Sequence, residues 1–147
     1  MQKTFPWMLI ALAATAQVLP HPFNVSPVAA LGLFAGAQLQ PRKAWAVPTI
    51  ALLAGNLVNG FYALPVLVCV YAGMLAGPLF GRLLLAGKRS PARFVGGTLA
   101  AAVVFFLTSN LGIWLAGMYS PDLAGLMECY VMGLPYLARS LLRDLAY

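Results

Sequence analysis

The run FVGGTLAAAVVFFLTSNLGIWLAG, residues 94–117, decides the fold class of this chain. It contains no charged residue and exceeds the roughly 20 helical residues that cross the hydrocarbon core of a bilayer. The polar triplet Thr108, Ser109 and Asn110 interrupts it. A polar group in hydrocarbon is costly unless another group satisfies it, so the triplet needs partners. The run predicts a membrane-spanning helix that carries a polar feature.

The composition of the whole chain points the same way. Of 147 residues, 62% are hydrophobic and 8% are charged, and the mean hydropathy is +0.86. Soluble domains carry about 25% charged residues. The apolar runs follow one another with connections of a few residues, which leaves no room for a separate soluble module. We therefore expect residues 1–147 to form a single transmembrane helical domain.

The predicted fold is an all-α polytopic membrane helix bundle with six transmembrane segments, at residues 5–19, 27–39, 45–60, 62–85, 94–117 and 122–138. The first segment also has the form of a secretory signal, but we expect it to be retained as a helix. The second is short for a span, so it should be tucked against neighbours or extended by its polar flanks. An alternative is five spans plus a re-entrant outer helix at 128–135 and a truncated last span that starts with RSLLRDLAY, residues 139–147.

The basic residues suggest an orientation. If the amino terminus is cytoplasmic, all nine Lys and Arg residues fall on the cytoplasmic side: Lys3, Arg42, Lys43, Arg82, Lys88, Arg89, Arg93, Arg139 and Arg143. This is the charge distribution that the positive-inside rule describes. It predicts a multi-pass protein of the bacterial inner (cytoplasmic) membrane with both termini in the cytoplasm. Because the basic residues stand in short groups beside apolar runs, they do not indicate a nucleic-acid partner.

Small residues recur four apart in three of the segments: Gly32 and Gly36; Gly73, Gly77 and Gly81; Gly97 and Ala101. This spacing allows helix backbones to approach closely in lipid. Packing within one bundle is one interpretation. The other is that Gly73, Gly77 and Gly81 form an interface with a partner subunit.

The predicted topology places most polar residues in the outer half of the bundle. At about 1.5 Å per helical residue, Asn110, Cys69, Glu128 and Cys129 lie roughly 10 Å below the outer surface. Polar groups at such depth usually face a bundle interior or a wet cavity. We predict a substrate-binding pocket open to the outside, lined by Asn56, Asn59, Tyr62, Ser109, Asn110, Trp114 and Glu128.

Other readings of these polar residues stay open. The amides and Ser109 could instead bond across helices and hold the bundle together, at about 1 kcal/mol each. Glu128 must be protonated, paired or hydrated, and His21 is the partner worth testing. Cys69 and Cys129 could meet, but we interpret them as small packing residues and predict no metal site.

Enzyme motifs are absent from the sequence, which has a single His and lacks a Gly-rich phosphate loop, HExxH and GxSxG. We therefore expect neither catalysis nor a cofactor, and any ATP hydrolysis would come from a partner.

Three blocks carry a resemblance to a known family: HPFNVSPVAALGLFAGAQL (21–39), TSNLGIWLAG (108–117) and YSPDLAGLMECYVMGLPYLARSLLRDLAY (119–147). They resemble DUF6580, a family of uncharacterised small bacterial multi-pass membrane proteins. That family is distantly similar to the S components of energy-coupling factor transporters, including the solitary cobalamin-type, BtuM-like group. The resemblance implies a six-helix vitamin or cofactor binder with an outward-facing pocket.

The chain departs from these relatives at several positions. Family members often have an acidic residue where Asn56 stands and a His near Phe61 and Tyr62. BtuM-like proteins place a cobalt-binding Cys near the outer start of the fourth helix, whereas Cys69 lies about two turns deeper. The cobalt-binding role is therefore not transferred to Cys69.

Two functions from different classes follow. The first is a membrane-embedded substrate-binding subunit for uptake of a small vitamin-like or cofactor-like molecule, with the lipid bilayer, its ligand and an energising transporter module or other membrane subunits as partners. The second is a non-catalytic accessory or scaffold subunit of a larger membrane protein complex.

Overall fold

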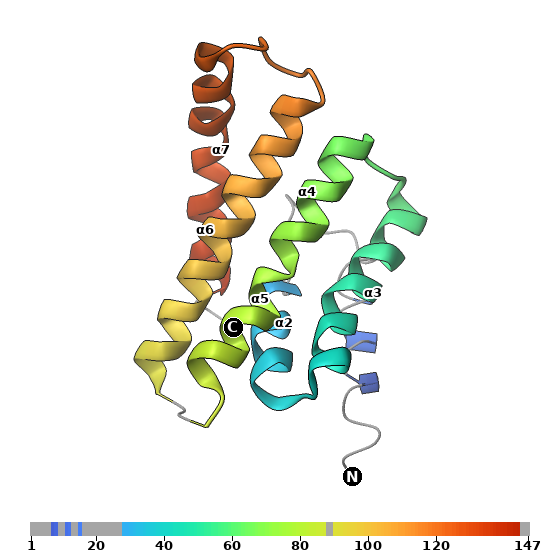
Figure 1. Cartoon of the computed structure of the whole chain (residues 1–147), viewed down its shortest axis with the longest axis vertical. Coiled ribbons are helices and arrows are strands. Elements are labelled where there is room, and N and C mark those ends of the chain that lie inside the picture. The colour runs from blue at the N-terminus through green and yellow to red at the C-terminus, as the bar shows by residue number, and fades with distance from the viewer. Residues whose placement is uncertain (1–6, 9–10, 13–14, 16–27, 88–89, 145–147) are drawn as a thin grey trace.

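A computed structural model describes residues 7–8, 11–12, 15, 28–87 and 90–144, and this part of the chain is entirely helical apart from its connections. The elements are α2 (Val28–Gln38), α3 (Pro41–Asn59), α4 (Leu64–Met74), α5 (Ala76–Phe80), the π-helix η1 (Gly81–Leu85), α6 (Pro91–Leu115) and α7 (Leu123–Asp144). Figure 1 shows α7, α6, α4 and α3 standing side by side in that order, with α2 packed near the lower end of α4. The predicted all-α fold class is confirmed.

Proline residues mark where the helices begin. Pro41 and Pro91 are the first residues of α3 and α6, and Pro65 is the second residue of α4. Proline suits a first turn because its missing N–H has no intrahelical partner there. The predicted segments began at residues 45, 62 and 94, so the prolines move these three helix starts by two to four residues.

Pro78 explains why the apolar segment 62–85 is not one regular helix. Its ring clashes with the carbonyl group four residues earlier, and it has no N–H to donate to that group. That carbonyl belongs to Met74, the residue at which α4 ends. The chain resumes as α5 and then widens into η1. The result is one apolar rod with a break near its middle.

Two of the described helices are long and apolar enough to cross a membrane, Leu64–Leu85 and Pro91–Leu115. The sequence predicted six spans, and the structure shows two candidates. The helix α2 has only 11 residues, and α3 and α7 carry charged side chains such as Arg42 and Glu128 that lower their hydropathy. Most of the first predicted segment, 5–19, lies outside the described residues. What is shown is an all-helical chain with two apolar helices compatible with a membrane protein.

The helix α7 bears on the alternative topology. It continues without a break from Leu123 to Asp144, although Pro135 lies inside it. Residues 128–135 therefore do not form a separate re-entrant turn.

Glycines bring α2 against α5 and η1. A Cβ atom on Gly81 would overlap the carbonyl oxygen of Leu33, and one on Gly36 would overlap the backbone of Pro78. Both contacts are with backbone atoms, so no side chain can move aside. Close approach of these backbones requires glycine at both positions.

The helices α4 and α6 pack antiparallel at similarly close range. A Cβ on Gly73 would meet the Thr108 hydroxyl and the Phe105 backbone, whereas one on Gly112 would lie 2.9 Å from the Cα of Val66. The two glycines occupy opposite ends of the contact, one on each helix. The two candidate membrane helices therefore pack directly against each other.

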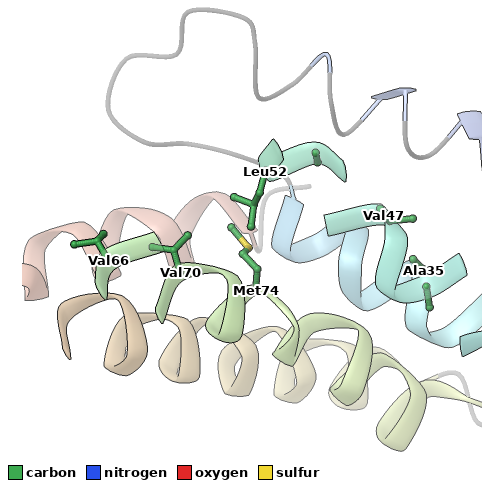
Figure 2. Close-up of a cluster of buried hydrophobic side chains, with 8 residues drawn as sticks. Ala35, Val47, Leu52, Val66, Val70 and Met74 are labelled. Atoms are coloured by element: carbon green, nitrogen blue, oxygen red, sulfur yellow. The ribbon is translucent and has the colours of Figure 1, made fainter. Parts of the chain in front are cut away.

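A hydrophobic core joins α2, α3 and α4. Figure 2 shows the side chain of Met74 from α4 beside Leu52 of α3, with Val70 and Val66 further along α4 on one side and Val47 and Ala35 on the other. Partly buried Phe105 and Ile113 of α6 pack against this core. The core thus fixes α3 on the side of α4 that faces away from α7.

Charge is distributed unevenly along the bundle. Arg42, Lys43, Arg82 and Arg93 stand in the first turns of α3 and α6 and in η1, at the end drawn lowest in Figure 1. Asp122 and the α3–α4 and α6–α7 connections lie at the other end. Among the described residues, one end of the bundle is therefore basic.

Candidate functional site

The polar triplet of α6 is satisfied mainly by its own helix. The Thr108 hydroxyl donates to the Val104 carbonyl at 3.0 Å, and the Ser109 hydroxyl donates to the Phe106 carbonyl at 3.3 Å. The Asn110 amide nitrogen donates to the same Phe106 oxygen at 2.8 Å. Such back-bonding to the preceding turn is a common solution for short polar side chains within a helix. These hydrogen bonds within α6 offset most of the desolvation cost of the triplet, so no second helix is needed for that purpose.

The Asn110 side chain also marks the place where α7 meets α6. The Cys129 thiol, only 2% exposed, donates to the Asn110 carbonyl at 3.3 Å and lies 3.8 Å from Oδ1 of the same residue. Gly133 lies one turn further along α7, and a Cβ there would sit 2.6 Å from that Oδ1 atom. Two small residues four apart therefore give α7 room for an amide side chain.

Aromatic contacts also join α6 to α7 along the seam that Asn110, Cys129 and Gly133 form. The Tyr130 hydroxyl donates to the Leu107 carbonyl at 2.8 Å, and its ring stands edge-on to Phe106 with centroids 5.7 Å apart. Tyr130 and Gly133 were not among the residues predicted to form the site. The spacing of Gly125, Cys129 and Gly133 was the signal that could have identified this face of α7, because small residues four apart often mark helix contacts.

A groove of about 200 Å³ opens beside this seam. It is lined by Asn110 and Ile113 of α6, by Tyr119 of the connection, and by Cys129, Met132, Gly133 and Tyr136 of α7. One amide, one thiol and two phenol groups thus interrupt otherwise apolar walls. Such a wall composition suits a small ligand with both polar and apolar parts.

The α6–α7 connection, which positions Tyr119, is fastened at both ends. The Trp114 indole N–H donates to the Ser120 carbonyl at 2.9 Å, and Gly117 takes a positive φ of 79° to turn the chain. The Asp122 carboxylate accepts the backbone N–H of Gly125 at 2.7 Å and caps the start of α7. Trp114 therefore holds the connection next to the groove and does not line it.

The other amide residues lie on the far side of α4. Asn56 is buried and donates to the Tyr71 hydroxyl at 3.3 Å, which links α3 to α4. Asn59 and Tyr62 are exposed at the end of α3 and in the connection that follows it. Because α6 and α4 stand between α7 and α3 in Figure 1, these three residues do not join Asn110 in one pocket.

Glu128 and Cys69 also lie away from the groove lining. Glu128 is exposed on α7, one turn before Met132, and its suggested partner His21 lies outside the described residues. Cys69 belongs to the α4–α6 contact, where it faces Gly112. Both cysteines are free thiols. The residues that were predicted to line one pocket therefore lie in different parts of the bundle, and only Asn110 lines the groove.

The glycines that were proposed for a partner interface are buried inside this chain. Gly73, Gly77 and Gly81 are all buried. Gly73 faces α6 and Gly81 faces α2. They hold this bundle together and present no free docking face. Among the residues that the structure describes, no group of three or more His, Cys, Asp or Glu side chains is placed to hold a metal ion.

These features define the class: a small all-helical protein whose two longest apolar elements pack against each other and are compatible with a membrane protein. A family model described as "Family of unknown function (DUF6580)" matches residues 1–147, and the chain belongs to that family. No curated protein and no solved structure matches the chain. The similarity to S components is not shown by these comparisons.

Proposed function

We propose that this protein is a membrane-embedded subunit that binds a small vitamin-like or cofactor-like molecule for uptake, and that the binding site is the α6–α7 groove. The groove carries the proposal, because it combines Asn110 with two tyrosines on otherwise apolar walls. Binding sites for small molecules have this character, with a few polar groups that orient a largely apolar ligand.

The volume of the groove restricts the ligand. About 200 Å³ is below the roughly 300–1,000 Å³ of sites for drug-sized molecules. A single aromatic or heterocyclic ring with one or two polar substituents fits this space, whereas a macrocycle such as a corrinoid does not. Tyr119 and Tyr136 supply ring faces and hydroxyl groups for such a compound, and Asn110 supplies its side-chain carbonyl.

The proposal includes a placement in the bacterial inner membrane. We place all six predicted segments in or against the bilayer, with the basic end of the bundle in the cytoplasm as the positive-inside rule requires. The groove then lies toward the outside. Since the sequence has no phosphate-binding loop, an energising partner would supply the work of transport.

The test fills the groove without disturbing the core. Met132 is 59% exposed and lines the groove, while Met127 on the same helix is 61% exposed and does not. Mass spectrometry of small molecules retained by the purified protein should detect a compound in the wild type and in Met127→Trp. Met132→Trp should lose it. Equal retention by both variants, or no retained compound in the wild type, would refute the assignment of the groove.

A specific observation also favours the second candidate, an accessory subunit of a larger membrane complex. Among the described side chains, every buried nitrogen or oxygen atom has a hydrogen-bond partner, so none of them needs a ligand. The helix α7 exposes large apolar residues on its surface, including Met127, Val131 and Leu134. Crosslinking from position 131 in intact membranes tests the accessory role: a specific protein adduct, with no small molecule retained by the wild type, supports it, and lipid adducts alone oppose it.

A further inference from the structure

A second hollow lies at the basic end of the bundle, opposite the α6–α7 groove. It has a volume of about 440 Å³ and is lined by residues 36–41, which turn from α2 into α3, and by Arg82 and Ala86 of the η1 region. Neither candidate function uses it. Its walls are formed by two chain segments whose backbones are held together at Gly36 and Gly81, so the hollow is a fixed feature of the packing.

One cationic side chain lines this hollow, and three more belong to chain segments next to its lining. Arg82 lines it directly. Arg42 and Lys43 are exposed in the first turn of α3, immediately after Pro41. Arg93 donates to the Leu84 carbonyl at 3.4 Å, which holds its guanidinium group two residues from Ala86. The carboxylates whose side chains the structure describes, Asp122 and Glu128, belong to the opposite end of the bundle.

Helix ends do not neutralise this charge. The carboxyl ends of α2 and η1 and the amino end of α3 all reach the hollow. Each carries a partial charge of about half an elementary unit, and two of the three are negative. Four full positive charges outweigh that remainder several-fold. An anion is therefore the complementary ligand.

The surface next to Arg82 is apolar and exposed. Leu79 stands one turn before Arg82, and its side chain is 43% exposed. Leu83 is the residue after Arg82, and its side chain is 65% exposed. These two leucines are four apart and lie on one side of the element, leading from the basic end toward the middle of the bundle. A molecule bound through its anionic group at Arg82 would have hydrocarbon surface available beside it.

We propose that this hollow binds the phosphodiester headgroup of an anionic phospholipid, with Arg82 as its central contact and Arg42 and Lys43 as flanking charges. A guanidinium group offers paired N–H donors that match two phosphate oxygens. Basic pockets between membrane helices bind such headgroups elsewhere. The acyl chains would then lie along Leu79 and Leu83. This site rests on the proposed placement in a membrane, but it is independent of the groove, and its test does not depend on ligand uptake.

The experiment is native mass spectrometry of the purified protein, titrated in detergent with phosphatidylglycerol or with phosphatidylcholine of the same acyl chains. Phosphatidylglycerol should bind more tightly. Arg82→Gln should weaken its binding about fivefold, as expected for roughly 1 kcal/mol per basic residue. Arg82→Lys should lose part of the affinity, because it keeps the charge but not the paired donors, and Arg139→Gln, which removes the same charge from α7, should not change it.

Further arms identify the source of the phosphate and guard against misfolding. Competition by inorganic phosphate to the same extent as by lipid would overturn the lipid assignment and indicate a soluble phosphate compound. Equal binding of both phospholipids, or equal loss in Arg82→Gln and Arg139→Gln, would overturn the site. If Arg82→Gln does not fold, Arg42→Gln gives the same test with a residue that is exposed in the first turn of α3.

Discussion

Two of the helix contacts that glycines form in this protein differ in what the glycine faces. In the α2–η1 contact, Gly81 faces the Leu33 carbonyl oxygen, so backbone meets backbone. In the α6–α7 contact, Gly133 faces the side chain of Asn110, so backbone makes room for a polar group. The same four-residue spacing thus closes one seam completely and keeps the other adaptable. The adaptable seam is the one that borders a groove.

The largest effect that separates the two contacts should come from Gly81→Ala. The added Cβ would overlap the Leu33 carbonyl oxygen, which cannot move without shifting α2. We expect a loss of about 3 kcal/mol or more in the free energy of unfolding, at the upper end of the overpacking range. Thermal unfolding in detergent would measure it. A loss below about 1 kcal/mol would mean that α2 and η1 are not in such close contact.

Gly133→Ala should have a smaller effect. Its Cβ would meet the Asn110 amide oxygen and, at 2.8 Å, Cε2 of Phe106, and both are side-chain atoms that can rotate away. We expect a loss of about 1–2 kcal/mol. In an Asn110→Ala background, Gly133→Ala should cost less than it does in the wild type, because the obstructing amide is gone. Additive losses in that double-mutant cycle would contradict the contact.

Asn110→Ala alone should cost about 1 kcal/mol, the usual net contribution of one hydrogen bond within a protein. It removes the group against which Cys129 and Gly133 pack and opens space beside the thiol. The alkylation rate of Cys129 by a small maleimide should therefore rise. Ser109→Ala is the matched control, because Ser109 bonds within its own helix at Phe106 and should leave the rate unchanged.

The smallest effect, and the one of opposite sign, should come from Gly96→Ala. No atom lies within 4 Å of a Cβ built on Gly96, which stands in the second turn of α6. Alanine in an open helical position should stabilise the protein by about 0.5–1 kcal/mol through its higher helix propensity. Together with Gly81→Ala, it tests whether the surroundings of a glycine decide the outcome. Destabilisation by Gly96→Ala would show that another chain or element covers this face.

The sequence predicted the helices better than it predicted the site, and Glu128 and Cys129 show why. Hydropathy and helix rise estimate how deep a residue lies, and these two neighbours share a depth. Successive residues of a helix point about 100° apart, however, so they face different surroundings. The structure turns Cys129 toward α6 and leaves Glu128 exposed. Because the prediction used depth alone, it assigned Glu128 to the pocket although its carboxylate is exposed.

Asn56 illustrates a second limit. It was predicted to line the pocket, with a bond across helices as the alternative, and it is buried and contacts a neighbouring helix through Tyr71. Which neighbour it contacts depends on the order of the helices in space, which the hydropathy pattern does not contain. By contrast, the starts of α3, α4 and α6 follow from local rules about proline and could be located from the sequence.

Pro78 has an evolutionary consequence. It ends α4 because it has no N–H to donate to the carbonyl of Met74. Its backbone and ring also fill the space beside Gly36 and Gly32. A relative that replaced the proline would regain a regular helix and lose the shape that these glycines fit. Across the DUF6580 family, positions 32, 36, 78 and 81 should therefore change together or not at all, and an alignment of its members would reveal that coupling.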